Sequence, residues 1–311
     1  MKQRLLLLTA ALAAVATLMG SKVFTAAPRR LLAVMAAAVI GVGGSAAFAA
    51  TQHAGAARAA SPAYPSSIAV IGHSMATGEG VSGPRVFRVR NSWVTGDTSA
   101  VQSLYSRILA RNPAVRGNKF NLARGGADVA SMLLQARKAV AIEPTPELVV
   151  VQGIDHDITC DKTGHRPFQV AFARVLDVLA TGLPDARIFV VSQFGSVPTY
   201  IKALTLKQRI NQRDRISPPT GPCAFLDARG APIPKGVAYL EAVIHRYEAA
   251  VATACKAVAT CRYDGGAFGR IVERPEYTSW DVIHLSVQGQ AKVAAVAWEA
   301  MKRVGIIPSS G

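Results

Sequence analysis

The sequence contains few acidic residues and few cysteines. Asp and Glu together number 19 against 35 Lys and Arg, so the 311-residue chain has a formal net charge of +16. Its four cysteines are too few for a small protein held together mainly by disulfides, and they lack the clustered spacing of a zinc site. We therefore expect no metal ion and no cofactor. Basic residues are not interleaved with aromatic ones, which argues against nucleic acid as a partner.

The chain also lacks internal repeats and heptad runs, and Pro (17) and Gly (26) are not in excess, which excludes fibrous classes. Half of the residues are apolar, which excludes an intrinsically disordered chain. The length allows one large domain or two modest ones. Since no boundary to a second domain is visible, we assign residues 66–311 to a single domain.

The N-terminal region is typical of an export signal. Residues 1–49 contain five cations and no acid, with uncharged apolar runs at residues 5–21 and 31–42. The second run follows a pair of arginines and leads to Ala-Phe-Ala at residues 47–49, a small-x-small pattern that a signal peptidase accepts. We expect residues 1–49 to direct the protein out of the cell or into the cell envelope, with residues 5–21 as an alternative membrane anchor. Residues 50–65, rich in Ala, Ser and Pro, are expected to be a flexible lead-in.

Export into an oxidising compartment predicts that the four cysteines form two disulfides. Four cysteines allow three pairings. We favour Cys255–Cys261, which are close in sequence, and this choice pairs Cys160 with Cys223. Free buried thiols are the alternative.

The rest of the chain alternates between two patterns. Short, continuously apolar runs typical of buried strands occupy residues 67–72, 119–123, 147–153 and 187–193, with a possible fifth strand at 260–263. Helical periodicity occupies residues 104–110, 129–140, 168–179, 237–259 and 286–304, and residues 195–235, with six prolines, are expected to be irregular. This alternation predicts an α/β domain in which helices cover both faces of a parallel sheet.

Polar residues follow the expected strands, where parallel sheets form their sites. Gly72-His73-Ser74-Met75 follows the first strand, and a serine at such a turn is either a nucleophile or a helix N-cap. Gly126 follows the second strand. It either forms a tight turn or offers its backbone N–H to an oxyanion. Asp155-His156-Asp157 follows the third strand and could supply donors or a base.

A last polar segment lies near the C-terminus. Asp281 and His284 are three residues apart, at a spacing that lets the carboxylate orient the imidazole of a general base. This spacing alone is frequent by chance, and the serine and Gly126 turns are also weak signals by themselves, whereas the polar cluster after the third strand is more telling.

Together, the four segments resemble the blocks of the SGNH hydrolase (GDSL-type esterase and lipase) superfamily. The resemblance implies a flavodoxin-like three-layer α/β/α fold with a central, mostly parallel five-stranded sheet. It implies ester hydrolysis through an acyl-enzyme on Ser74, with His284 as base and Asp281 as its partner. It also implies an oxyanion hole formed by the N–H groups of Ser74 and Gly126 and the side chain of His156. The sequence Gly-Glu-Gly at residues 78–80, after the serine, resembles the sequence at this place in a secreted actinobacterial branch of the family.

Two departures from the family pattern leave alternatives open. His73 stands where the family usually has Asp, and His156 stands where it usually has Asn. A catalytically weak or inactive binding protein of the cell envelope is therefore one alternative. An α/β-hydrolase is another, because Gly-His-Ser-Met resembles a nucleophile elbow. Against it, Ala76 replaces the second glycine of that motif and the serine follows the first strand.

The expected partner is an ester substrate, with lipid, aryl and acetylated-glycan esters all open. The excess of basic residues makes an association with anionic envelope polymers or lipids a further possibility. We expect a monomer.

Overall fold

The computed structural model describes residues 63–81 and 88–309, so the expected signal segment and most of the lead-in lie outside the described residues. Five strands form one sheet in the order β2-β1-β3-β4-β5, and all neighbours pair in parallel. The strands are β1 (Ile68–Gly72), β2 (Lys119–Asn121), β3 (Leu148–Gln152), β4 (Arg187–Val190) and β5 (Cys261–Tyr263). Each lies within or beside a run predicted from the sequence.

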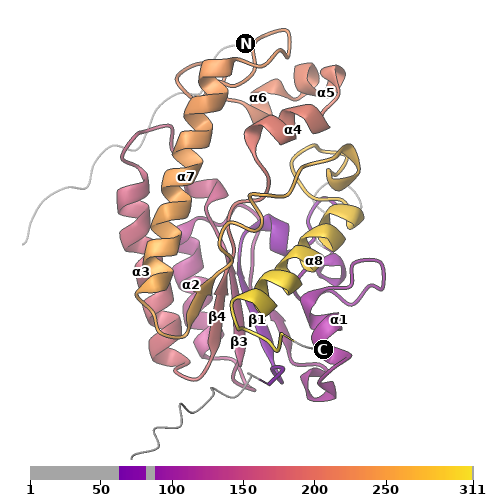
Figure 1. The fold of residues 1–311 in the computed structure, drawn as a ribbon, viewed down its shortest axis with the longest axis vertical. Coiled ribbons are helices and arrows are strands. Elements are labelled where there is room, and N and C mark those ends of the chain that lie inside the picture. The colour runs from indigo at the N-terminus through magenta and orange to yellow at the C-terminus, as the bar shows by residue number, and fades with distance from the viewer. Residues whose placement is uncertain (1–62, 82–87, 310–311) are drawn as a thin grey trace, which may run out of the picture. The chain divides into compact units, whose positions relative to one another are not determined.

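Helices cover both faces of this sheet (Figure 1). One layer contains α1 (Leu104–Leu109) and α8 (Val287–Arg303), and the other contains α2 (Val129–Val140), α3 (His165–Gly182) and α7 (Pro234–Lys256). Successive side chains along each strand point to opposite layers. Val70 and Val150 belong to the core under α1 and α8, whereas Ala69 and Val149 belong to the core under α2, α3 and α7. Both faces are therefore buried, which explains why the strands read as continuous apolar runs.

The strand order is that of a flavodoxin-like doubly wound sheet. It confirms the three-layer fold, and it favours the SGNH arrangement over the α/β-hydrolase alternative. The order reverses between β1 and β3, so segments that leave these strands at their carboxyl ends flank a crevice. Short 3-10 helices occur at Ser74–Ala76, Val89–Asn91, Pro113–Val115, Asp155–Asp157 and Pro275–Tyr277. Two of them directly follow β1 and β3.

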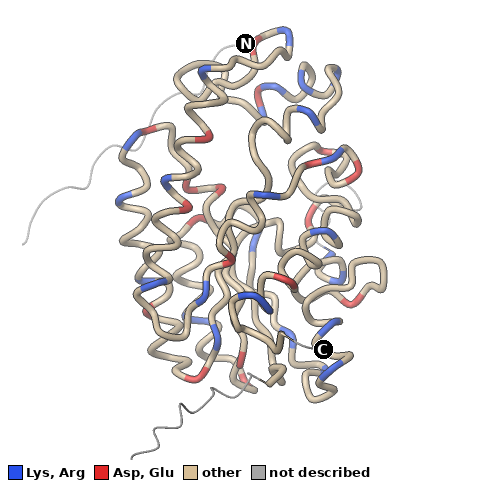
Figure 2. The backbone as a smooth tube through the Cα atoms, viewed as in Figure 1, with Lys and Arg blue, Asp and Glu red and all other residues tan. Residues whose placement is uncertain are grey.

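The prediction of an irregular segment at residues 195–235 was wrong for its first half. That half folds into α4 (Val197–Ala203), α5 (Leu206–Asn211) and α6 (Arg213–Ile216). Capping boxes start α4 at Ser196 and α5 at Thr205, and each helix is too short to show helical periodicity in the sequence. We call residues 195–233 the insertion. Figure 2 shows that Lys and Arg are frequent along α4–α6.

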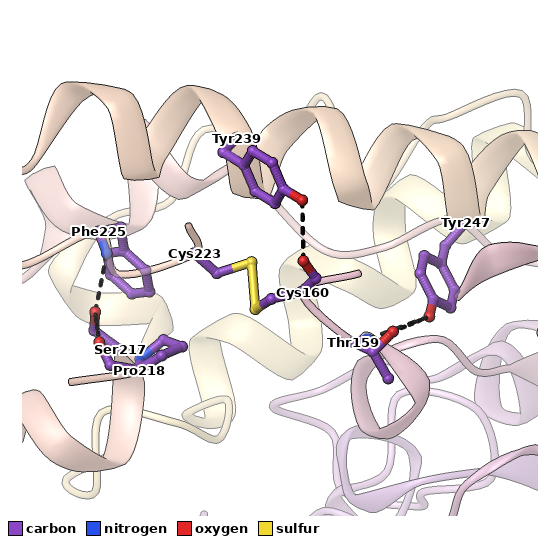
Figure 3. Close-up of a disulfide and its surroundings, with 8 residues drawn as sticks. All are labelled: Thr159, Cys160, Ser217, Pro218, Cys223, Phe225, Tyr239 and Tyr247. Atoms are coloured by element: carbon purple, nitrogen blue, oxygen red, sulfur yellow. Dashed lines mark hydrogen bonds between the residues drawn. A yellow bond between two sulfur atoms is a disulfide. The ribbon is translucent and has the colours of Figure 1, made fainter. Parts of the chain in front are cut away.

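Both expected disulfides are present in the structure. Cys255–Cys261 joins the end of α7 to β5. Cys160–Cys223 joins the segment after β3 to the insertion (Figure 3). None of the helices within the two described ranges is long and apolar enough to cross a membrane.

Candidate active site

Ser74 lies at a sharp turn at the carboxyl end of β1. Gly72 has a φ of 142°, and a Cβ atom there would lie 2.0 Å from the carbonyl oxygen of Gln152 on the neighbouring strand, so the close pairing of β1 with β3 requires glycine. The amide of Gln135 on α2 accepts from the N–H of Gly72 at 2.6 Å and donates to its carbonyl at 3.0 Å. These bonds hold the chain where it leaves the strand, just before Ser74.

The residues after Ser74 are held equally firmly. Gln290 on α8 donates to the carbonyl of Met75 at 3.0 Å, and Asn121 at the end of β2 donates to the carbonyl of Ala76 at 2.8 Å. Side chains from both neighbouring elements therefore fix the short helix that starts with Ser74. The serine itself is 8% exposed and lines a cavity, so the residue borders the cavity and is mostly shielded from solvent.

His284 and Asp281 form a close pair. The Nδ1 atom of His284 lies 2.6 Å from Oδ2 of Asp281, while Oδ1 of Asp281 accepts from the N–H groups of Ile283 and His284 at 3.1 and 3.0 Å. The carboxylate thus holds both the imidazole and the turn that carries it. Val282 within this turn has a φ of 59°, a left-handed conformation that is strained for a β-branched residue.

The pKa values of the pair shift in opposite directions. Burial alone would raise the pKa of Asp281, but hydrogen bonds from the His284 side chain and from two backbone N–H groups lower it to about 2. Burial alone would lower the pKa of His284, but the hydrogen bond with Asp281 and the charges of Asp281 and Glu79 raise it above its usual value. His284 is therefore a stronger base than free imidazole, and it donates Nδ1–H to an ionised carboxylate.

Glu79 is a site residue to which the sequence analysis gave no role. Its Oε2 atom lies 3.9 Å from Nε2 of His284 and is buried without a hydrogen-bond partner among the described residues. The adjacent Gly80 has a φ of 74°, and a Cβ there would lie 2.7 Å from Cβ of His284. The carbonyl of Gly80 accepts from the hydroxyl of Ser279 at 2.5 Å. The Gly-Glu-Gly sequence thus packs on the imidazole. Its two glycines are the feature of the sequence that indicates this close contact.

Gly126 and His156 line the same cavity as Ser74. Gly126 has a φ of 72°, with open space where a Cβ would be, and His156 is exposed at the end of β3.

Asp157 does not bond to His156. Both of its carboxylate oxygens accept from the N–H of Val129 at the start of α2, at 3.1 and 3.0 Å, and burial raises its pKa to about 6. Ile154 has a φ of 141°, so strained backbone also occurs on this side of the site.

His73 is the departure from the family pattern that lies beside the serine. It is almost fully buried, its Nδ1 accepts from the N–H of Met75 at 3.5 Å, and its Nε2 lies 3.3 Å from Oδ2 of Asp155. Burial lowers the pKa of His73, against the raising effect of the Asp155 carboxylate. Its ring meets that of His156 edge-on, with centroids 5.6 Å apart. His73 therefore joins the serine turn to the end of β3.

Ser74 and His284 open onto one cavity of about 700 Å³. Among the described residues, no hydrogen bond joins the Ser74 hydroxyl to His284. The cavity has a polar part near Ser74 and an apolar part beneath the insertion. The polar part includes Glu79, Asp155, His156, Gln193, Glu273 and His284, and Arg215 lines the cavity from the insertion. In the described ranges, no three His, Cys, Asp or Glu side chains are placed to bind a metal ion.

No model of a known protein family matches the chain, and no curated protein matches it. Solved structures do. A carbohydrate esterase family 2 enzyme of Corynascus thermopiles (Myceliophthora fergusii) aligns with a TM-score of 0.50 and 12% identity over 78% of this chain and 68% of its own. A family 3 carbohydrate esterase of Clostridium thermocellum aligns with a TM-score of 0.44 and 14% identity, over 77% and 96%.

A phospholipase A1 from Streptomyces albidoflavus aligns with a TM-score of 0.45 and 13% identity, over 75% of this chain and 98% of its own. At such identities the similarity concerns the fold alone. The chain therefore shares the fold of the family 2 carbohydrate esterase, a fold of the class that the four sequence segments predicted, and the chemistry has to be argued from its own residues.

Proposed function

We propose that the protein hydrolyses carboxylic esters through an acyl-enzyme intermediate on Ser74. The observation that carries this proposal is the His284–Asp281 pair, which opens onto the same cavity as Ser74. A serine, a histidine with a raised pKa and a buried aspartate that orients it are the three parts of a hydrolytic triad. This site supports acyl transfer better than passive binding, because binding alone has no need of an oriented base.

The proposed reaction uses the geometry of the pair. Because His284 donates Nδ1–H to Asp281, its Nε2 is free to accept the Ser74 proton as the serine oxygen attacks the ester carbonyl. His284 then returns that proton to the departing alcohol. In the second half-reaction, a water molecule gives a proton to His284 and its oxygen attacks the acyl carbon. The bond from the acyl carbon to Ser74 then breaks, His284 returns the proton to the serine oxygen, and the acid is released. Asp281 stays ionised throughout and stabilises the imidazolium.

The negative charge of the tetrahedral intermediate requires hydrogen-bond donors. We assign the N–H groups of Ser74 and Gly126 and the side chain of His156 to this role, since all three residues line the cavity. An imidazole N–H is able to replace the amide donor that the family usually has. His73 is a positioning residue in this scheme, because it contacts Met75 and Asp155.

The test is the reaction of the purified protein with a fluorophosphonate probe and with p-nitrophenyl esters. The probe should label Ser74, and Ser74→Ala or His284→Ala should lower kcat by about a thousandfold or more. Ser66→Ala is the matched control, because that hydroxyl bonds to Glu147 near the opposite ends of the strands. A folded protein that neither reacts with the probe nor cleaves any ester would be a binding protein instead.

We propose that this reaction occurs outside the cell or in the envelope, with residues 1–49 acting as the export signal or with residues 5–21 as an anchor. Two disulfides support an oxidising location. The basic surface fits an association with anionic envelope polymers or lipids, and a monomer is sufficient for the site.

A further inference from the structure

The apolar part of the cavity is built from three segments that are far apart in the sequence. One follows β3, one belongs to the insertion, and one is the first half of α7. Their apolar residues on the cavity wall are Ile158, Cys160, Ile216, Pro218, Cys223, Phe225, Leu240 and Ile244. The disulfide itself forms part of the wall. The polar residues that the insertion adds to the cavity lining are Ser196, Tyr200 and Arg215, and the hydroxyl of Tyr200 already donates to the carbonyl of Val282.

This wall is held in place before any ligand arrives. The disulfide Cys160–Cys223 ties the insertion to the segment that follows β3, and the hydroxyl of Tyr239 on α7 donates to the carbonyl of Cys160 at 3.0 Å (Figure 3). The hydroxyl of Ser217 accepts from the N–H of Phe225 at 3.1 Å. A preformed apolar wall lowers the ordering cost of binding a flexible apolar ligand.

The insertion also has a small core of its own. Val197, Ile201, Phe225 and Leu226 are buried together, and Ile244 of α7 packs against them. Phe225 and Ile244 therefore contact the interior of the insertion and also line the cavity. The wall is the inner surface of a packed unit, so its shape is fixed by packing as well as by the disulfide.

We propose that this apolar part is an acyl-chain subsite, and that the enzyme prefers esters of chains of roughly six to ten carbons over acetyl esters. The inference rests on the proposed function, because it takes Ser74 as the point at which the acyl group is attached. The whole cavity, its polar part included, has about 700 Å³, which is the volume of sites for medium-sized ligands and more than an acetyl group fills. A sugar packed against these apolar side chains would lose hydrogen bonds to water that they cannot replace, whereas an alkyl chain loses none.

The test compares p-nitrophenyl acetate, butyrate, hexanoate, octanoate and palmitate below their micelle-forming concentrations. Each methylene buried against the wall should raise kcat/KM by about fourfold until the wall ends. We expect octanoate to exceed acetate by at least about fiftyfold, and palmitate to fall back. Acetate equal to or better than octanoate, with hydrolysis still dependent on Ser74, would overturn the subsite and leave the proposed function intact.

A substitution in the wall gives a second test. Ile244→Phe should lower the ratio of kcat/KM for octanoate to that for acetate by about tenfold, since the larger ring takes space from the chain. Ala249→Phe is the matched control, because Ala249 is exposed on the same helix and outside the cavity. Equal octanoate-to-acetate ratios in these two variants would show that the chain binds elsewhere.

Binding without catalysis provides a third readout. By calorimetry, Ser74→Ala protein should bind decanoate at least about tenfold more tightly than acetate, and Ile244→Phe should remove this difference. This measurement works whether or not the protein turns over an ester. Equal binding of decanoate and acetate would contradict the subsite, and a preference for decanoate in a protein without esterase activity would contradict only the proposed reaction.

Discussion

At the scale of single residues, the acid limb of the pH profile should depend on Glu79. His284 has to be neutral to accept a proton from Ser74, so kcat/KM should fall as the pH drops below the raised pKa of His284. The Glu79 carboxylate, 3.9 Å from Nε2, contributes to raising that pKa. Glu79→Gln should therefore move the acid limb of kcat/KM to lower pH.

The control for this measurement is Glu299→Gln. Glu299 is exposed on α8, where it pairs with Lys302 at 3.3 Å, so its loss should leave the limb in place. An acid limb that stays fixed in Glu79→Gln, or that moves to higher pH, would show that the carboxylate does not act on His284.

The sequence indicated Ser74, Asp281 and His284 because each has a short-range signature: a turn after an apolar run, or a carboxylate three residues before an imidazole. It could not reveal Glu79 as a neighbour of His284, because that contact joins segments about two hundred residues apart. His73 was noticed only as a departure from a pattern. Its place between Met75 and Asp155 depends on how β1 and β3 pair, which is a property of the folded sheet.

At the scale of elements, α4 is coupled to the turn that carries His284. The hydroxyl of Tyr200 donates to the carbonyl of Val282 at 2.7 Å, and Val282 has the strained backbone of this turn. Tyr200→Phe removes this hydrogen bond, so the turn no longer holds the Asp281–His284 pair as firmly in place. The net free energy of one hydrogen bond corresponds to a loss of about five- to tenfold in kcat. KM for a short ester should change little, because Tyr200 acts through the turn.

Tyr105→Phe is the matched control, because the Tyr105 hydroxyl accepts from the N–H of Gly117 at 3.2 Å, away from the cavity. A rise in KM with kcat unchanged in Tyr200→Phe would mean that this hydroxyl contacts substrate and does not position the turn.

The elements that the sequence predicted well are those with a strong local signal. The strands appear as continuous apolar runs because both faces of the sheet are covered, and α2, α3, α7 and α8 are long enough to show periodicity. The helices of the insertion have six or seven residues, or four in α6, which is less than two turns. Capping boxes start α4 and α5, and α4 also packs on α7, so these helices depend on contacts that a periodic pattern in the sequence does not show.

At the scale of the whole molecule, the two disulfides close loops of very different length. Cys160–Cys223 spans 63 residues and joins the insertion to the segment after β3. Cys255–Cys261 spans 6 residues between the end of α7 and β5. A longer closed loop removes more conformational freedom from the unfolded chain, so the first bond should contribute ~4 kcal/mol to the free energy of unfolding and the second ~2 kcal/mol. Replacing each pair by serines and measuring urea unfolding of the folded variants tests this order. A smaller loss of stability for the Cys160–Cys223 pair would show that the insertion stays attached through packing on α7, with the disulfide as a minor constraint.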